Sequence, residues 1–437
     1  MLVKRIRGRP YFPALCFFCT ILFFLYPSEL REQVLDLTPL KRDYHGPRHP
    51  LYKPRRNATA PIVDNFPLAS AAKTRSDLPP IPSWNLPPDP HVPEKTPILI
   101  GFTRNWLLLQ QAVLSYITAG WPPEDIYVVE NTGTMNSNKL GRLSLQNPFY
   151  LNYDRLTKVF GVNVISTPTY LTFSQLQNFY LHLAIENEWD YYFWGHMDVI
   201  AVSEEDYKDP ATGKYESLYM RSVQDLRKTV NEYGRRGRWA IRFYAYDRMA
   251  LVNRYAFEEV GGWDTQIPYY GSDCDMHERL SMAGFKQEDA RNGLVYDIGT
   301  PLDDVSVLFR RTAPSPADAP EAGKDEMRRD FSVQRWGRED TLASPAWKAL
   351  TDRLHGMQHA KNHDARGRNT WQSRQTGGQG EPYYKDPDGF EQAILMTIEF
   401  GRNLMAEKWG HRGCNLRAAG LGKGDEWRVR HDWESRW

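Results

Sequence analysis

Residues 191–198, YYFWGHMD, form an apolar run that ends abruptly on His196 and Asp198. A short apolar run of this kind predicts a buried strand over 190–194. Side chains two apart on a strand point to the same face, so we expect His196 and Asp198 to leave it together, with Met197 turned into the core. A hard cation on a phosphate needs a carboxylate oxygen, which Asp198 can supply and His196 can supplement. The alternative is a strand that simply ends in polar loop residues.

A second acidic cluster follows in GGWD at 261–264 and YGSDCDMHERL at 270–280. Asp273 and Asp275 stand where a helix is predicted to begin. A carboxylate held near an aromatic wall has its pKa raised by desolvation, which suits a general base, and we favour Asp273 over Asp275 for that role. The alternative is helix capping, because Asp275 and the Glu three residues later resemble a capping box.

Apolar runs alternate with helical patterns between residues 97 and 244. Strands are predicted at 97–102, 125–131, 162–165, 190–194 and 239–244, and helices at 107–119 and 173–188. Continuous apolar strands joined by helices indicate an α/β fold with a mostly parallel sheet flanked by helices. Such sheets bind ligands at the carboxyl ends of their strands.

Polar residues at these strands are the candidate binding residues. Arg104 follows the first strand and is a candidate phosphate contact, with loop solvation as the alternative. Glu130 and Asn131 close the second strand and are candidates for hydrogen bonds to a uracil or ribose, although Asn also favours turns. Arg242 lies inside a strand and needs a partner if buried, for which a phosphate or Asp198 is the candidate.

The C-terminal part of the chain is expected to be an extension over 311–437, with mobile loops and an amphipathic helix over 390–409. His355, His359 and His363 recur every four residues, as helical metal ligands can. One of these histidines could complete a metal shell at Asp198; the alternative is an ordinary polar helix.

The N-terminus has the pattern of a membrane anchor. Residues 1–10 are basic without an acid, and 11–26 carry no charge. We predict a cytosolic tail, a transmembrane signal anchor over 11–26 and a Pro-rich stem over 27–95, with a glycosylation acceptor at Asn57. The remainder of the chain would then be lumenal. A cleaved signal peptide and a buried core segment are the alternatives.

The bulk composition narrows the class of partner. The chain has 437 residues, enough for one large domain with appendages, and a net charge of +1. That balance argues against a nucleic-acid partner, which would favour a strongly basic domain. Cys274 and Cys414 would face an oxidising compartment, where they could pair or remain separate buried thiols.

These features resemble the GT-A glycosyltransferases, most closely the family-2-like and Golgi galactosyltransferase types. The likeness rests on the anchor and stem, Glu130, HMD at 196–198 and GGWD…YGSDCDMHERL at 261–280, and it covers about residues 96–300. In those families an Asp-x-Asp triplet after the fourth strand binds Mn²⁺ and the nucleotide diphosphate. Here His196 replaces the first acid of that triplet.

The same families carry a Gly-Gly-aromatic-Asp turn before a Glu-Asp-x-Asp cluster, whose first Asp is the inverting base. The resemblance therefore implies that Asp273 is the base, with Ser272 in place of the Glu. It further implies a GT-A-like catalytic domain over 96–310 and Mn²⁺ or Mg²⁺ held by Asp198 and His196.

The resulting hypothesis is an inverting glycosyltransferase that uses a nucleotide-diphosphate sugar, with a UDP-sugar favoured, and a glycan or glycoconjugate acceptor. It would be a single-pass type II protein of the Golgi membrane, or of the endoplasmic reticulum. The main alternative is a glycosyltransferase-like protein without activity that binds glycans or partners. A metal-dependent phosphate-ester hydrolase is disfavoured, because the predicted strands offer too few further ligands.

Overall fold

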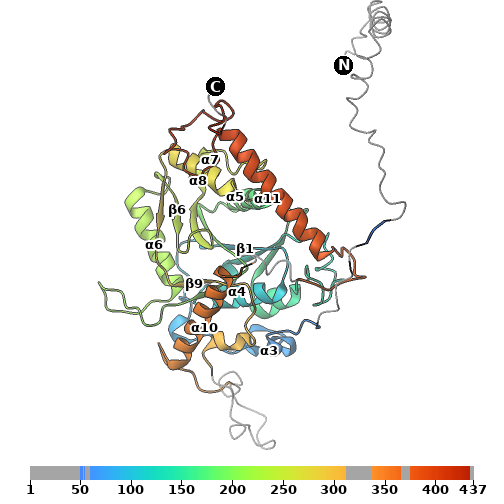
Figure 1. Cartoon of the computed structure of the whole chain (residues 1–437). Coiled ribbons are helices and arrows are strands. Elements are labelled where there is room, and N and C mark those ends of the chain that lie inside the picture. The colour runs from blue at the N-terminus through green and yellow to red at the C-terminus, as the bar shows by residue number, and fades with distance from the viewer. Residues whose placement is uncertain (1–49, 53, 55–59, 312–335, 366–374, 434–437) are drawn as a thin grey trace, which may run out of the picture. The chain divides into compact units, whose positions relative to one another are not determined.

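The computed structural model describes residues 50–52, 54, 60–311, 336–365 and 375–433 (Figure 1). Residues 59–437 form one compact unit. The predicted anchor over 11–26, the acceptor Asn57 and the predicted loop at 312–325 lie outside the described residues. Within the described ranges, no helix is both long and apolar enough to cross a membrane.

A seven-stranded sheet in the order β3-β2-β1-β4-β7-β6-β8 forms the centre of this unit. The pairs β1–β2, β2–β3, β1–β4 and β6–β8 are parallel, and β7 runs antiparallel to both β4 and β6. The predicted α/β fold with a mostly parallel sheet is thereby confirmed. The strands are β1 (Ile98–Phe102), β2 (Ile126–Glu130), β3 (Asn163–Ser166), β4 (Tyr191–Gly195), β6 (Trp239–Phe243), β7 (Met249–Asn253) and β8 (Lys286–Asp289).

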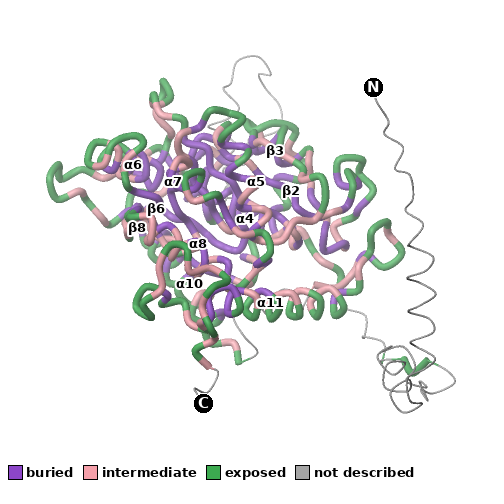
Figure 2. Tube along the Cα trace, turned by 90° about the horizontal axis from the view of Figure 1, so that it is seen from above, coloured by how far each residue is buried: buried purple, intermediate pink, exposed green. Residues whose placement is uncertain are grey.

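Helices cover both faces of the sheet, because its strands are apolar on both sides. Ile98 and Ile100 of β1 pack into one core, whereas Leu99 between them packs into the other. The first core includes α4 (Trp106–Thr118) and α6 (Leu218–Tyr233). The second includes α5 (Phe173–Glu186), α7 (Arg254–Glu259) and α8 (Ser272–Met282). Figure 2 shows this interior as an almost continuous buried layer.

A small second sheet continues from the end of β4. Strand β5 (Val199–Val202) pairs antiparallel with β9 (Leu294–Asp297). The amide of Ala201 donates to Ser115 Oγ at 2.9 Å, which fixes β5 to α4. Helix α10 (Pro345–Asn362) lies beside β9 (Figure 1), where the amide of Asp297 donates to Gln358 Oε1 at 2.8 Å.

The expected spacer over 27–95 is wrong in its later part, because residues from about 61 onward pack on the domain. Phe66 is fully buried and stacks on Phe309 with ring centroids 5.8 Å apart. Asp64 forms an ion pair with Arg155 at 2.7 Å. These contacts come from single residues between prolines, so they leave no periodic signal in the sequence.

The rest of the described chain is made of short helices and a long C-terminal helix. Helix α11 (Pro387–Trp409) agrees with the predicted amphipathic helix over 390–409. Its middle is exposed or half-buried (Figure 2), whereas both of its ends contact the domain. The short elements are α3 (Pro67–Ala71), η1 (Arg75–Asp77), η2 (Ser83–Asn85), η3 (Pro123–Asp125), η4 (Arg155–Phe160) and η5 (Val305–Phe309).

Candidate active site

The strand order creates a switch point between β1 and β4. From β1 the chain proceeds outward to β2 and β3, and then returns to place β4 on the other side of β1. In open α/β sheets, ligands bind beyond the carboxyl ends of the strands at such a point. The residues that follow β1, β2 and β4 therefore share one edge of the sheet, as the sequence predicted.

At the end of β2, Glu130 is saturated by protein donors. Its Oε1 accepts from Thr132 Oγ1 at 3.0 Å and Asn138 Nδ2 at 2.7 Å. Its Oε2 accepts from Ser166 Oγ at 2.9 Å and from the hydroxyl of Tyr153. Only 3% of Glu130 is exposed. This residue organises the loops after β2 and β3, which corrects its expected role as a nucleoside contact.

Asn131 has a similar structural position. Its side-chain amide donates to Leu171 O at 2.8 Å, and its Oδ1 accepts from the amide of Leu171 at 2.7 Å. The hydroxyl of Thr167 donates to the same oxygen at 3.2 Å. These bonds hold the loop after β3, and they correct the expectation that Asn131 binds a uracil or ribose.

Arg104, beyond β1, is covered by the C-terminal helix. The guanidinium donates to Glu391 Oε2 at 3.1 Å and lies 4.4 Å from the ring centre of Phe390. The Nζ atom of Lys385 lies 5.2 Å from the centre of the same Phe390 ring. Burial, followed by the charge of Arg104, lowers the pKa of Lys385. Two cations and one carboxylate leave this end of the edge positively charged.

Arg242 lies away from the candidate site. Its guanidinium pairs with Asp225 of α6 at 2.9 Å and with Glu288 of β8 at 2.5 Å. Burial acts to lower the pKa of Arg242, but the bonds to these two carboxylates outweigh burial and raise it. The expected phosphate or Asp198 contact is therefore wrong.

The end of β4 differs from the expected geometry. The strand stops at Gly195, so His196 and Asp198 belong to the following turn rather than to a strand face. His196 Nδ1 and Asp198 Oδ1 are 3.9 Å apart, which is too long for a hydrogen bond. The His196 side chain is 30% exposed, and that of Asp198 is 12% exposed.

Lys361 of α10 contacts Asp198 directly. Its Nζ lies 2.6 Å from Asp198 Oδ2 and 2.6 Å from Asp297 Oδ1, and it donates to Ile298 O at 3.2 Å. Burial acts to raise the pKa of Asp198, but the charges of Lys361 and His196 together with the hydrogen bond from Lys361 outweigh burial and lower the pKa.

These contacts test the fit of the expected Mn²⁺ or Mg²⁺. Asp198 and Asp297 are hard oxygen ligands of the right type, but the space between them holds an ammonium group. The described residues contain no group of three or more His, Cys, Asp or Glu side chains able to hold a metal ion. The side chains at this position therefore do not fit a divalent cation as they stand.

The expected histidine ligands have other contacts. His355 packs edge-on against Tyr296, with ring centroids 4.8 Å apart, and His359 stacks on His363 at 3.9 Å. The C-terminal segment does reach Asp198, as proposed, but through Lys361.

Arg248 faces the same edge and was missed by the sequence reasoning. Gly195 pairs with Met249 across β4 and β7, so Arg248 lies opposite His196, whose amide donates to Arg248 O at 3.0 Å. Arg248 is half-buried, and its Nε has no hydrogen-bond partner among the described residues.

The first turn of α8 separates the two candidate bases. Asp275 is fully buried and bonded to Arg279 at 2.8 Å, Lys408 at 2.7 Å and the indole of Trp409 at 2.9 Å. It tethers α11 to α8, which corrects its expected place in the catalytic pair. The helix begins at Ser272, so the capping-box interpretation is wrong as well.

Asp273, by contrast, is half-buried and lies beside Tyr246 of the β6–β7 turn. Desolvation, followed by the negative charge of Asp273, raises the pKa of Tyr246 to about 12. Because Tyr246 is 49% exposed, this carboxylate stands near solvent. Tyr246 and Arg248 share one turn, which links Asp273 to His196 at the end of β4.

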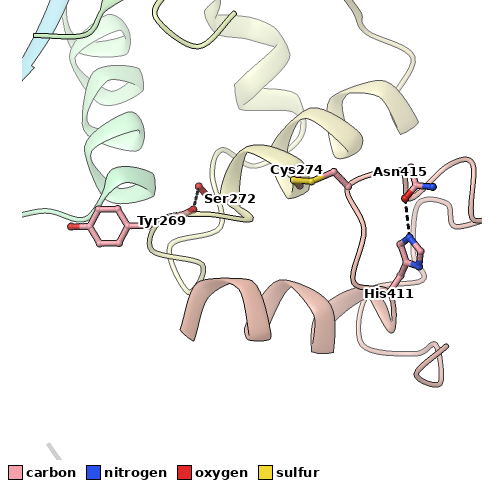
Figure 3. The surroundings of a disulfide bond; sticks show 6 residues. Tyr269, Ser272, Cys274, His411 and Asn415 are labelled. Atoms are coloured by element: carbon pink, nitrogen blue, oxygen red, sulfur yellow. Dashed lines mark hydrogen bonds between the residues drawn. A yellow bond between two sulfur atoms is a disulfide. The ribbon is translucent and has the colours of Figure 1, made fainter. Parts of the chain in front are cut away.

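A disulfide fixes this helix to the C-terminal segment (Figure 3). Cys274 in the first turn of α8 is joined to Cys414, beyond the end of α11. The sequence had left this pairing open. Lys408 adds an ion pair to Asp264 at 2.8 Å. The GGWD turn, the start of α8 and the end of α11 therefore form one cross-linked unit behind Asp273.

Comparisons with known proteins give a partial likeness. No protein-family model and no curated protein matches the chain. Among solved structures, a cytidylyltransferase from Leptospira borgpetersenii matches at 15% identity and a TM-score of 0.28, over 47% of this chain and 82% of that one. A mannosyltransferase from Pyrobaculum calidifontis, in complex with GDP-Man and Mn²⁺, matches at 16% identity and 0.26, over 48% and 58%. The catalytic domain of Drosophila β1,4-galactosyltransferase 7 matches at 13% identity and 0.25, over 45% and 64%.

The last two matches span less than two thirds of the solved chains. Such low scores carry no argument about the activity of this chain. The assignment of a site at the β1–β4 switch point therefore rests on its own strand order and contacts.

Proposed function

We propose that this protein is an inverting glycosyltransferase that transfers a sugar from a nucleotide-diphosphate donor. The observation that carries this proposal is the switch point between β1 and β4, which has Arg248 and His196 at its edge and Asp273 across the β6–β7 turn. This arrangement places a cation and a carboxylate on two sides of one turn. A transferase needs both, one for the leaving diphosphate and one for the acceptor proton.

The proposed reaction assigns one role to each group. An acceptor hydroxyl attacks the anomeric carbon, the new C–O bond forms, and the bond to the diphosphate oxygen breaks with inversion. Asp273 takes the hydroxyl proton, and the guanidinium of Arg248 stabilises the charge on the departing diphosphate. Arg104 and Lys385 extend the positive charge toward the end of β1. No step of this scheme is assigned to a metal.

The wider setting is part of the same proposal. The donor favoured is a UDP-sugar, the acceptor is a glycan or glycoconjugate, and the protein is a type II membrane protein of the Golgi. The membrane expectation derives from the uncharged run at 11–26, and the donor and acceptor classes are what the resemblance of HMD at 196–198 and of residues 261–280 to the GT-A glycosyltransferases implies.

The test compares Asp273→Asn with a surface control, Asp154→Asn, whose side chain is 77% exposed and pairs with Lys158. Donor binding is measured by calorimetry across a panel of nucleotide sugars, and transfer by release of the nucleoside diphosphate with an acceptor mixture. Loss of a general base lowers the rate by roughly 10²–10⁴-fold, so Asp273→Asn should bind the donor and lose transfer while the control keeps both. Full transfer by Asp273→Asn would refute its role as base.

The alternative of a non-catalytic glycan- or partner-binding protein is favoured by one observation, the replacement of the first triplet acid by His196. The same panel separates the two proposals. A folded wild-type chain that binds a glycan acceptor but no nucleotide sugar would support the alternative.

A further inference from the structure

We infer that Lys361 is a resident cation that takes the place of a divalent metal at the end of β4. Asp198 and Asp297 hold its ammonium group in the space between them, at 2.6 Å from each carboxylate. The inference about metal binding stands apart from the proposed function. Its consequence, that the donor is bound without Mn²⁺, rests on that function.

The geometry uses every donor of the lysine. An ammonium group has three N–H bonds. Those of Lys361 have acceptors in Asp198, Asp297 and the carbonyl of Ile298. A magnesium-sized ion would need oxygen atoms at about 2.0–2.1 Å, in the same volume as the nitrogen atom. The lysine and a metal therefore exclude one another.

The two carboxylates are held in place by the backbone around them. Asp297 pairs with Val199 across the small sheet, and the amide of Ile298 donates to Asp198 O at 2.9 Å. The acids are thus presented side by side whether or not Lys361 is present. This is a preorganised pair of hard ligands, of the kind that binds Mg²⁺ or Mn²⁺ when nothing else occupies it.

Helix α10 delivers the lysine with little freedom. Trp347, Leu350 and Leu354 of this helix are buried, and the Trp347 indole donates to Ser203 O at 3.2 Å. Lys361 stands in the last turn, where a positive charge is favoured by the helix dipole. Only 3% of its side chain is exposed. A buried charge of this kind persists when it is paired and hydrogen-bonded, as it is here.

The charges predict the effect of removing the lysine. Lys361 brings one positive charge to within 2.6 Å of both carboxylates, and its replacement by an apolar side chain takes that charge away from the pair. Two adjacent carboxylates that lose a shared cation attract a divalent ion, because hard oxygen ligands of this kind bind Mg²⁺ or Mn²⁺. Replacing the lysine should therefore create a metal site that the wild type lacks.

The experiment titrates Mn²⁺ into the full chain after chelator treatment, by calorimetry and by the electron paramagnetic resonance signal of free Mn²⁺. Wild type is compared with Lys361→Met, with the double variant Lys361→Met/Asp297→Asn, and with Lys348→Met. Lys348 is a matched control on the same helix, with a side chain 71% exposed. Lys361→Met should bind one Mn²⁺ at least about tenfold more tightly than wild type, and the double variant should lose this gain because one ligand charge is gone. Lys348→Met should behave as wild type.

Two results would overturn the inference. One is tight, stoichiometric binding of Mn²⁺ by the wild type that is lost in Asp198→Asn, a result that does not depend on how Lys361→Met folds. The other is a folded Lys361→Met, by circular dichroism, that binds Mn²⁺ no better than the wild type. Nucleotide-sugar binding with and without chelator is measured in parallel. Binding that requires Mn²⁺ overturns the metal-free donor site, whereas absence of any donor binding counts against the proposed function and leaves the metal titration to decide on Lys361.

Discussion

The two halves of the sheet edge carry similar residue types but differ in how those residues are bonded. At the ends of β2 and β3, Glu130 and Asn131 have their side-chain oxygens engaged by protein donors. At the end of β4 and the start of α8, Arg248 has a nitrogen without a partner among the described residues, and Asp273 stands near solvent. The first half organises loops, whereas Arg248 and Asp273 of the second half remain available for a ligand. The two halves of the edge are distinguished by how many of their donors and acceptors are satisfied within the protein, and not by residue type.

The largest expected effect is a loss of stability when Glu130, at the end of β2, is replaced. Glu130→Ala removes the acceptor of four donors, from Thr132, Asn138, Tyr153 and Ser166, and the first two of these residues are buried. We expect the free energy of unfolding to fall by about 3–5 kcal/mol, measured by chemical denaturation. Glu186→Ala is the control, since its side chain is 59% exposed and pairs only with His182 among the described residues. If Glu130→Ala instead lost ligand binding and kept its stability, Glu130 would be a binding residue and not a structural one.

Asp273 and Asp275, two residues apart in α8, show the same contrast between an available and a fully bonded side chain. Asp275→Asn removes the negative charge between Lys408 and Arg279, so we expect a loss of about 2–3 kcal/mol in the free energy of unfolding. Asp273→Asn should lower the free energy of unfolding by less than about 1 kcal/mol, because this half-buried carboxylate lies beside the exposed Tyr246. Thermal and denaturant unfolding of the two variants measure the difference. Equal destabilisation would show that Asp273 is structural as well.

Arg248→Gln tests whether Arg248, in the second half, contributes to binding of the donor. A hydrogen-bonded charge contact contributes about 1.5–3 kcal/mol, which corresponds to roughly a 10–100-fold weaker donor affinity. The unfolding midpoint should not change, because this guanidinium has an unpartnered Nε within the described part of the chain. Calorimetry with the nucleotide sugar, or with the nucleoside diphosphate alone, measures the affinity. Arg238→Gln, at a site 61% exposed and paired with Glu259, should bind as wild type does.

The sequence predicted the strands on which this edge is built, because their apolar runs are continuous and their helices regular. It missed β7 and α6, and with β7 it missed Arg248. The β6–β7 turn, at 244–248, has no Gly or Pro to mark it, so the hairpin gives no local signal. The resemblance placed Asp198 and Asp273 at the edge but implied nothing about their bonding.

Long-range partners account for the rest. Lys361 reaches Asp198 from 163 residues away, and the Trp409 indole reaches Asp275 from 134 residues away. Both contacts depend on where α10 and α11 pack, which no local pattern encodes. Asp273 and Asp275 look alike in sequence for the same reason: only the C-terminal helix makes one of them structural.

A smaller effect is expected of pH on stability, through a histidine close to Asp273. His277 of α8 is half-buried, and its Nδ1 lies 2.7 Å from Gln287 Oε1. Burial lowers the pKa of His277, although Gln287 and the charges of Asp273, Asp247 and Glu278 act to raise it. The unfolded chain therefore binds this proton more readily, so the contribution of His277 to stability is full above pH 6.5, the ordinary value, and is lost as the pH falls below it.

We expect stability to fall between pH 6.5 and 5.5 by at most about 1 kcal/mol, the bound that one proton sets over this interval. His277→Gln should flatten that part of the stability profile, measured by denaturant unfolding at several pH values. His182→Gln, with a side chain 57% exposed, should leave the slope as in wild type. Parallel profiles for His277→Gln and wild type would mean that the proton is accommodated behind Asp273 at no cost.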